Sequence, residues 1–298
     1  MSLFERLDVR PYEELGVLRA RRAMAAVTRS QTAPLPVARV EDVTVPGAVG
    51  RLPTRVYDPA PGAGLPLVVY VHGGGFSLGN VEAADGPCRR LAETAKVVVA
   101  SVEYRLAPES PFPAGLEDCR AAVDWLLDDP GRVGAGDGRI LVGDSAGAHL
   151  VASTSVQRRD AGLRPADAQV LIYPTVRPAR GNPFRSYEEN ADAPLMSRST
   201  MTWFWDQYLP ASHDPTDPRI DLLRCPDFRG LPRTLIVAAE LDPLRDEGLE
   251  LAARMAEDGV PVETSLYEGA VHGFWWLDAA LGQAAELDGE LAAFIGRL

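Results

Sequence analysis

Short, continuous apolar runs rich in β-branched residues recur along the chain, and each is followed by a longer stretch with helical periodicity. The runs LVVYV, VVVASV and LIVAA are examples. Such runs are typical of parallel strands that helices bury on both faces. The pattern therefore predicts an α/β fold built on a mostly parallel sheet. A chain of 298 residues with 46% apolar and 24% charged residues can bury a core of that kind.

Eight strands and six helices are predicted. The first two strands are more polar and close together in sequence, so they are expected to form an antiparallel hairpin at one edge. The strands are Val40–Val45, Thr54–Tyr57, Pro66–Val71, Val97–Val102, Ile140–Val142, Gln169–Tyr173, Thr234–Ala239 and Glu263–Tyr267. The helices are Gly86–Thr94, Ala114–Leu127, Ala146–Arg158, Arg198–Tyr208, Arg245–Asp258 and Leu277–Arg297.

Two segments interrupt this alternation of strand and helix. Residues 1–38 are helical in period before any strand, and Thr175–Asp221 is rich in Pro and Asn around one aromatic helix. Ligands bind α/β sheets at the carboxyl ends of the strands, so both segments are expected to form a lid over that edge. The predicted organisation is a cap over 1–40 and 181–221 and a core over 41–180 and 222–298.

Charge and cysteine content exclude several classes of protein. The formal net charge is −12, whereas nucleic-acid binding needs a positive surface. No run of 18 apolar residues indicates membrane insertion, and the first residues have no apolar core of a secretory signal. A cytoplasmic location is therefore expected. Three widely spaced cysteines, Cys88, Cys119 and Cys225, do not fit a disulfide framework or a zinc site.

The pentapeptide GDSAG at Gly143–Gly147 lies between a predicted strand and a predicted helix. In a G-x-S-x-G turn the serine is held in a strained conformation, and small neighbours let the strand and the helix approach each other. The hydroxyl then projects above the sheet, and the helix amino end favours developing negative charge. Ser145 is therefore the predicted nucleophile.

A second glycine-rich segment, HGGGF at His72–Phe76, also ends a predicted strand. Glycines allow backbone N–H groups to turn outward, and two such donors can hold the oxyanion of a tetrahedral intermediate. A phosphate-binding loop is disfavoured, because no G-K-[ST] follows.

A histidine and three acids follow the last two predicted strands. His272 comes after the final strand, and Glu240, Asp242 and Asp246 come after the preceding one. The chain order Ser, acid, His is that of a nucleophile elbow with its general base, and histidine suits the base because its charge changes near neutral pH. Asp242 precedes Pro243, so it could instead cap the next helix. The residues alone leave the choice among the three acids open.

The set HGGGF, YRLAPE (Tyr104–Glu109), GDSAG, DPLRDE and HGF resembles the hormone-sensitive lipase family of esterases in its bacterial branch, from about residue 65 to the end. The resemblance implies an α/β-hydrolase fold with an eight-stranded sheet and a two-piece helical cap. It implies a triad of Ser145, His272 and Asp242, with the N–H groups of Gly74, Gly75 and Ala146 as oxyanion donors. It further implies a small-molecule ester substrate, no metal or organic cofactor, and a homodimer.

The function expected is a carboxylesterase that cleaves short- to medium-chain acyl esters through an acyl-enzyme intermediate. The same groups would serve the hydrolysis of amides, carbamates or lactones. A ligand receptor on the same fold is another alternative, but the plant gibberellin receptors lack the histidine that is present here as His272.

Other motif residues are predicted to have structural roles. The YRLAPE segment is expected to be a turn tied by Arg105 and Glu109. His149, one turn after Ser145 on the same predicted helix, is expected to be a packed residue and not an alternative base. His213 is expected to be solvated. The aromatic segment Met201–Tyr208 and one of Trp275 and Trp276 could line the substrate pocket.

Overall fold

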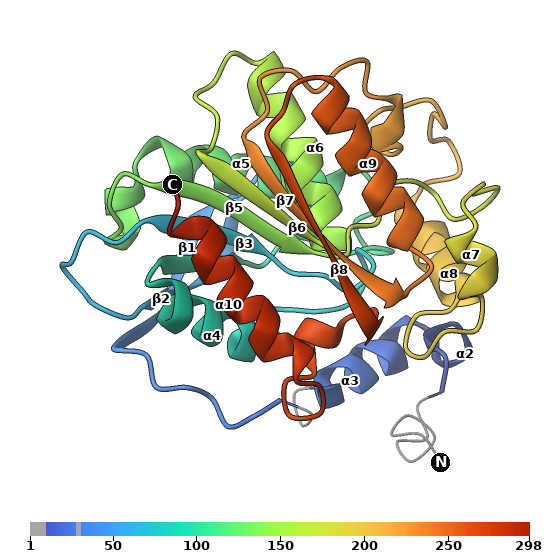
Figure 1. The fold of residues 1–298 in the computed structure, drawn as a ribbon, viewed down its shortest axis with the longest axis horizontal. Helices are drawn as coiled ribbons and strands as arrows, with labels where there is room; N and C mark the ends of the chain where they lie inside the picture. Colours follow the sequence, from blue (N-terminus) through green and yellow to red (C-terminus); the bar gives the residue numbers. More distant parts are fainter. Residues whose placement is uncertain (1–9, 28–30) are drawn as a thin grey trace.

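A computed structural model describes residues 10–27 and 31–298 of the protein. Within them, eight strands form one sheet in the order β1-β2-β4-β3-β5-β6-β7-β8 (Figure 1). The pairs β1–β2 and β2–β4 are antiparallel, and all other neighbours are parallel. The strands are β1 (Arg39–Pro46), β2 (Arg51–Asp58), β3 (Leu67–Val71), β4 (Val98–Val102), β5 (Arg139–Asp144), β6 (Ala168–Ile172), β7 (Arg233–Leu241) and β8 (Val262–Val271). The predicted α/β-hydrolase fold and its mostly parallel sheet are confirmed.

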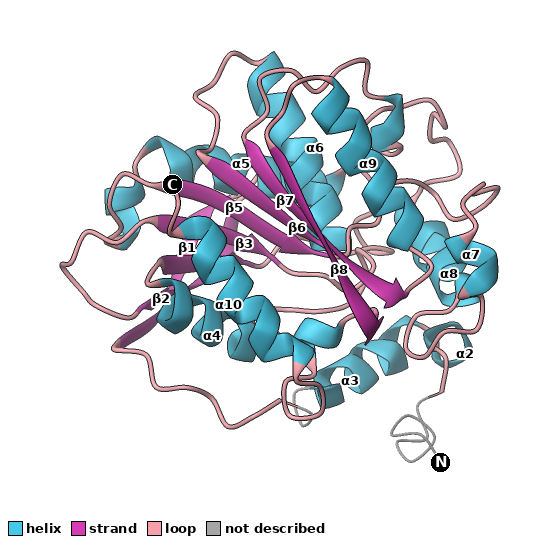
Figure 2. Cartoon of the chain, in the orientation of Figure 1, coloured by secondary structure: helices cyan, strands magenta, loops and turns pink. Residues whose placement is uncertain are grey.

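Helices cover both faces of this sheet (Figure 2). Alternate residues of β3 show why: Val69 and Val71 belong to a core cluster with α5, α6 and α9, while Val68 and Tyr70 belong to one with α4 and α10. Successive side chains of a strand point to opposite faces, so a continuous apolar run fills both. The helices are α2 (Tyr12–Leu15), α3 (Val17–Val27), α4 (Asp85–Ala95), α5 (Ala114–Asp128), α6 (Ala146–Asp160), α7 (Ser186–Glu189), α8 (Arg198–Tyr208), α9 (Arg245–Glu257) and α10 (Gln283–Ile295).

The last helix begins later than its sequence pattern predicts. It starts at Gln283, not at Leu277, and a short 3₁₀ turn at Phe274–Trp276 precedes it. Asp278, in the intervening segment, lies 3.2 Å from the buried guanidinium of Arg90 on α4. This tertiary contact holds Leu277–Gly282 in turns although its residues favour a helix.

Helix α2 lies beside α8, which is nearly 190 residues away in sequence (Figure 1). Glu13 of α2 accepts hydrogen bonds of 2.6 Å from the hydroxyls of Ser199 and Thr200, and the rings of Tyr12 and Phe204 are 5.9 Å apart. The two predicted cap segments therefore touch each other. Part of the first, residues 1–9 and 28–30, lies outside the described residues, and its last two residues belong to β1.

Candidate active site

The turn between β5 and α6 holds Ser145 in a strained backbone conformation, with φ 53° and ψ −120°. A positive φ is uncommon for a residue with a side chain and costs about 1–3 kcal/mol, which the surroundings must supply. Those surroundings are tight, because a Cβ on Gly147 would lie 2.0 Å from the carbonyl oxygen of Val71. A Cβ on Gly143 would lie 2.5 Å from the carbonyl carbon of Gly147. The small residues beside Ser145 are therefore required for α6 to pack against β3 and β5.

Ser145, His272 and Asp242 form a continuous hydrogen-bonded chain. The His272 Nε2 lies 2.9 Å from the Ser145 Oγ, and the His272 Nδ1 lies 2.7 Å from the Asp242 Oδ2. All three side chains are at least 95% buried. Ser145 directly follows β5, Asp242 directly follows β7, and His272 directly follows β8. A carboxylate can only accept from Nδ1–H, so the neutral imidazole has Nε2 free to accept the serine proton.

The three acids near the end of β7 have separate partners. Only Asp242 contacts His272. Glu240 accepts a hydrogen bond of 2.7 Å from the N–H of Gly269, near the end of β8. Asp246 accepts the N–H of Ser186 at 2.9 Å and pairs with Arg245. Asp242 therefore has the position expected of an orienting carboxylate, and the other two acids hold β8 and α7 in place.

The glycine-rich loop after β3 leaves several backbone donors unused. Gly74 and Gly75 have φ of +113° and +58°, and a Cβ would lie 2.3 Å from the Leu78 carbonyl oxygen or 2.1 Å from the Phe204 ring, respectively. Within the described residues, the N–H groups of Gly74, Gly75 and Ala146 find no acceptor in the chain. Three donors next to the serine are thus available to a bound oxyanion.

Asp144, beside Ser145, anchors this loop. One of its oxygens accepts the Tyr70 hydroxyl at 2.6 Å and the N–H of Gly73 at 2.8 Å. Burial raises the pKa of this carboxyl, although the two hydrogen bonds oppose the shift. The second residue of GDSAG therefore connects the turn that carries Ser145 to the glycine loop, a role that the motif alone did not indicate.

The YRLAPE segment is a structural turn, but Arg105 and Glu109 bind different elements rather than each other. Arg105 pairs with the buried Asp118 of α5 at 2.6 Å, and Glu109 pairs with Arg21 of α3 at 2.7 Å. The hydroxyl of Tyr104 donates to the carbonyl of His72 at 2.8 Å. The segment thus ties the glycine loop to α5 and to the amino-terminal helices.

A pocket of about 80 Å³ adjoins Ser145 and His272. Segments far apart in sequence form its walls, and Leu195 among them has a positive φ of 67°. Of the two tryptophans considered from the sequence, Trp276 lines the pocket, whereas Trp275 is buried elsewhere and donates to Asp288 at 2.6 Å. The other apolar wall residues are Tyr12, Met24, Leu78, Leu195, Met196, Phe204 and Leu277.

The remaining histidines and cysteines lie outside this arrangement. His149 is buried with its ring nitrogens facing the carbonyls of Thr175 and Arg219 at 3.2 and 2.9 Å, and burial lowers its pKa. It lies on α6 itself, one turn after Ser145, and is a fully buried, packed residue, as predicted. His213 is only half exposed, because its Nδ1 bonds to the Pro210 carbonyl at 2.8 Å. Cys88, Cys119 and Cys225 are all buried and free, which agrees with the sequence analysis.

Across residues 10–27 and 31–298, no group of three or more His, Cys, Asp or Glu side chains is arranged to hold a metal ion. In the same residues, no helix is both long enough and apolar enough to cross a membrane.

A serine on a strand–turn–helix junction, served by a histidine and an aspartate from later strands of a mostly parallel sheet, defines the α/β-hydrolase class. A family model described as "alpha/beta hydrolase fold" matches residues 68–276. The chain is 38% identical over 283 residues to the carboxylesterase NlhH of Mycobacterium tuberculosis, covering 92% of this chain and 88% of that one.

The chain is also similar to solved structures of ester hydrolases. An ester hydrolase, EH1AB1, from the metagenome of Lake Arreo superposes with a TM-score of 0.93 at 36% identity, covering 99% of this chain and 96% of that one. A hyperthermophilic esterase of Pyrobaculum calidifontis gives 0.89 at 39% identity, covering 95% and 93%. The protein belongs to the α/β-hydrolase family, in its branch of hormone-sensitive-lipase-like esterases. The predicted family and enzyme class, a serine carboxylic ester hydrolase, are confirmed.

Proposed function

We propose that this esterase hydrolyses carboxylic esters with short to medium acyl chains, with Ser145 as nucleophile, His272 as general base and Asp242 as the orienting acid. The hydrogen-bonded chain from Ser145 through His272 to Asp242 carries the proposal. Its geometry gives a serine hydroxyl, a base within reach of its proton, and a carboxylate that fixes the tautomer of the base.

The reaction has two steps. His272 Nε2 takes the Ser145 proton as Oγ attacks the ester carbonyl, and the resulting oxyanion accepts hydrogen bonds from the N–H groups of Gly74, Gly75 and Ala146. The carbonyl re-forms as the C–O bond to the alcohol breaks, and His272 gives its proton to the leaving alkoxide. Water, deprotonated by the same imidazole, then attacks the acyl-enzyme, and Ser145 leaves with the proton that His272 returns.

The acyl preference rests on the size and lining of the pocket. Its volume of about 80 Å³ is well below the roughly 300–1,000 Å³ of sites for drug-sized ligands. Its walls are mostly apolar, and the charged or polar groups among them are Asp144, Ser145 and His272 together with the Tyr12 hydroxyl. A short alkyl chain fits such a space, whereas a long chain would have to displace Phe204 or Leu195. The same groups could cleave amides, carbamates or lactones, and no feature of the pocket favours those substrates.

A series of p-nitrophenyl esters from acetyl to palmitoyl tests the proposal. We expect kcat/KM to be highest between about two and eight carbons and to fall beyond that, without activation at a lipid interface. Ser145→Ala should lower kcat by about 10³-fold or more while circular dichroism stays unchanged. A rate that rises through palmitoyl esters would contradict the acyl preference, and an active Ser145→Ala variant would contradict the choice of nucleophile.

Other expectations from the sequence stay proposals. They are the cytoplasmic location, the homodimer, and the cap formed by residues 1–40 and 181–221 over a core of 41–180 and 222–298. The contacts of Glu13 with Ser199 and Thr200 support the last of these, because they join the two cap segments.

A further inference from the structure

A second cavity, of about 710 Å³, lies away from Ser145. It is bounded by the carboxyl end of α8, by the segment before α7 and by the segment after α8. Three arginines and two aspartates line it: Arg177, Arg180, Arg224, Asp206 and Asp221. Three guanidinium groups against two carboxylates give this lining a net charge of +1, in a protein whose net charge is −12. A cationic cavity on an acidic protein favours an anionic ligand.

Two of these arginines converge on one buried carboxylate oxygen. The Arg177 Nη2 lies 3.4 Å, and the Arg224 Nε 3.3 Å, from the Oδ2 of Asp221, whose side chain is 4% exposed. Both distances are long for a charge-assisted hydrogen bond, which is usually about 2.7–2.9 Å. The single negative charge of Asp221 therefore offsets only one of the two guanidinium groups.

The hydrogen-bonding capacity of this wall is almost unused. Within the described chain, the side chain of neither Arg177 nor Arg224 donates a hydrogen bond, although each guanidinium has five N–H donors. The Nε of Arg177 is itself buried without a partner. By contrast, Arg180 is bonded through two nitrogens to Asp206.

Trp205 of α8 adds an independent unpaired donor. It lines the same cavity, is only 2% exposed, and its indole N–H has no acceptor in the described chain. An indole N–H can only donate, and leaving a buried donor unpaired costs about 1–3 kcal/mol. The indole N–H of Trp205 is buried in the cavity wall, so the donors open to a ligand rich in acceptors are those of the partly exposed guanidinium groups of Arg177 and Arg224.

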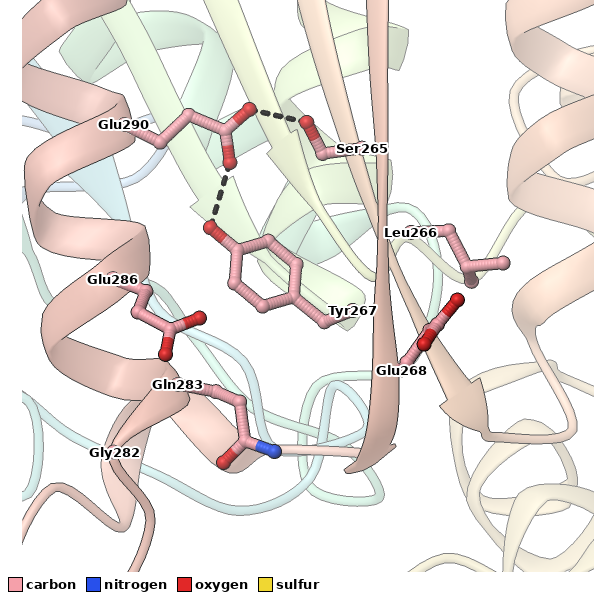
Figure 3. Close-up of a pocket in the computed structure, with 8 residues that line it drawn as sticks. All are labelled: Ser265, Leu266, Tyr267, Glu268, Gly282, Gln283, Glu286 and Glu290. Atoms are coloured by element: carbon pink, nitrogen blue, oxygen red, sulfur yellow. Dashed lines mark hydrogen bonds between the residues drawn. The ribbon is translucent and has the colours of Figure 1, made fainter.

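The pocket between β8 and α10 has the opposite chemistry (Figure 3). Glu268, Glu286 and Glu290 line it without any arginine or lysine. Glu290 accepts hydrogen bonds from Ser265 and, at 2.7 Å, from Tyr267 (Figure 3). An anion would be repelled there, so the two cavities differ in the ligand that each can take.

We propose that the cavity bounded by Arg177, Arg224 and Trp205 binds a small oxyanion, either a phosphate or a carboxylate group of a small molecule. The forked donors of a guanidinium match the oxygens of either group. The bound anion joins α8 to the chain segments around Arg177 and Arg224, and so stabilises the folded protein by mass action. The site is separate from Ser145 and does not depend on ester hydrolysis.

The test measures the thermal unfolding midpoint of the full-length protein while inorganic phosphate or malonate is titrated, with sodium chloride at matched ionic strength as the reference. We expect a saturable rise in Tm with at least one of the two anions, and none with chloride. A rise in Tm with phosphate alone would identify a phosphoryl ligand, and a rise with malonate alone would identify a carboxylate ligand. A rise with both would identify a general oxyanion site. The absence of a saturable rise with either anion would overturn the proposal.

Variants locate the binding. Arg224→Gln should weaken the affinity for the anion at least tenfold. The double variant Arg177→Gln/Arg224→Gln should abolish binding. If the double variant fails to fold because Asp221 has lost its cations, the single variant still decides the question. The matched control is Arg229→Gln, which makes the same charge change at an exposed arginine paired only with Asp227, and which should bind normally.

One further variant tests whether the anion binds at the active site instead of in this cavity. Ser145→Ala should bind the anion as the wild type does, whatever its activity on esters. Unchanged affinity in Arg224→Gln, or weaker binding in Ser145→Ala alone, would overturn the assignment to this cavity.

Discussion

The two carboxylate oxygens of Asp242 have different partners: Oδ2 accepts from His272 at 2.7 Å, and Oδ1 accepts the backbone N–H of Leu244 at 2.9 Å. The same side chain thus faces the histidine and holds the start of α9. Asp242→Asn keeps an acceptor for Leu244 but can present an amide N–H to His272, which disfavours the tautomer with Nε2 free. We expect kcat to fall by about 10³–10⁴-fold with little loss of stability, measured by steady-state kinetics and urea unfolding.

Asp246→Asn is the matched control for that variant. Asp246 contacts Ser186 and Arg245, not His272, so its loss should change kcat by less than about tenfold. An inactive Asp246→Asn protein beside an active Asp242→Asn protein would show that the acid has been wrongly assigned.

Protonation of His272 should set the acid limb of activity. An imidazolium has no lone pair at Nε2 to accept the Ser145 proton across their 2.9 Å contact. We therefore expect log kcat/KM for p-nitrophenyl acetate to fall on the acid side with a slope of about one per pH unit. The measurement is a pH profile at constant ionic strength, with circular dichroism at each pH. A flat profile from pH 5 to 8 in folded protein would contradict His272 as base.

The second glycine of GDSAG should be irreplaceable for packing. A Cβ on Gly147 would lie 2.0 Å from the Val71 carbonyl oxygen, which belongs to a central strand and cannot move aside cheaply. Gly147→Ala should lower the free energy of unfolding by at least about 3 kcal/mol or prevent folding.

The control is Gly289→Ala on the exposed side of α10, where a Cβ meets nothing within 4 Å. There the substitution should raise stability by about 0.5–1 kcal/mol, because alanine loses less backbone entropy in a helix. Urea unfolding measures both, and a stable, fully active Gly147→Ala protein would contradict the packing argument.

The sequence predicts what depends on local pattern. Continuous β-branched runs such as Leu67–Val71 indicate buried parallel strands, and GDSAG fixes a strained turn because its glycines leave room for close packing. Local pattern also places His272 and the three acids just beyond the ends of strands. It does not choose among those acids, since only the three-dimensional contact of Asp242 with His272 separates them.

The pocket walls could be predicted only in part. The aromatic helix that contains Phe204 and the pair Trp275 and Trp276 were expected to contribute, and Phe204 and Trp276 do. Tyr12 and Leu195 carry no local motif and reach the pocket only because distant segments fold over one edge of the sheet. The late start of α10 also depends on a tertiary contact, that of Asp278 with Arg90. Propensity describes each segment in isolation, so it misses both.

Glu247, in the DPLRDE segment, is the buried acid with the clearest consequence for stability. It is fully buried; Oε1 accepts the N–H of Val176 at 2.7 Å and Oε2 accepts the Asn182 amide at 2.6 Å. No cation of the described chain forms an ion pair with it. Burial raises its pKa to about 8, and these two hydrogen bonds only partly oppose the shift.

A raised carboxyl pKa makes stability fall as pH rises. Below about 4.5 the carboxyl is protonated in both the folded and the unfolded chain, so it contributes no pH dependence. Between about 4.5 and 8 the unfolded chain loses the proton while the folded chain keeps it, and the free energy of unfolding falls by up to about 1.4 kcal/mol per pH unit. Above about 8 both states are ionised and the dependence ends.

Glu247→Gln removes the titrating proton while keeping the shape of the side chain. The wild type should therefore lose about 3–4 kcal/mol relative to this variant between pH 5 and pH 8, whatever constant difference the altered contact with Asn182 adds. Urea unfolding at pH 5, 6, 7 and 8 gives the difference directly. For Glu250→Gln, at an exposed position of the same helix, the free energy of unfolding should change with pH as it does in the wild type. Parallel curves for Glu247→Gln as well would mean that Glu247 is already ionised in the folded protein, and that the hydrogen bonds from Val176 and Asn182 outweigh its burial.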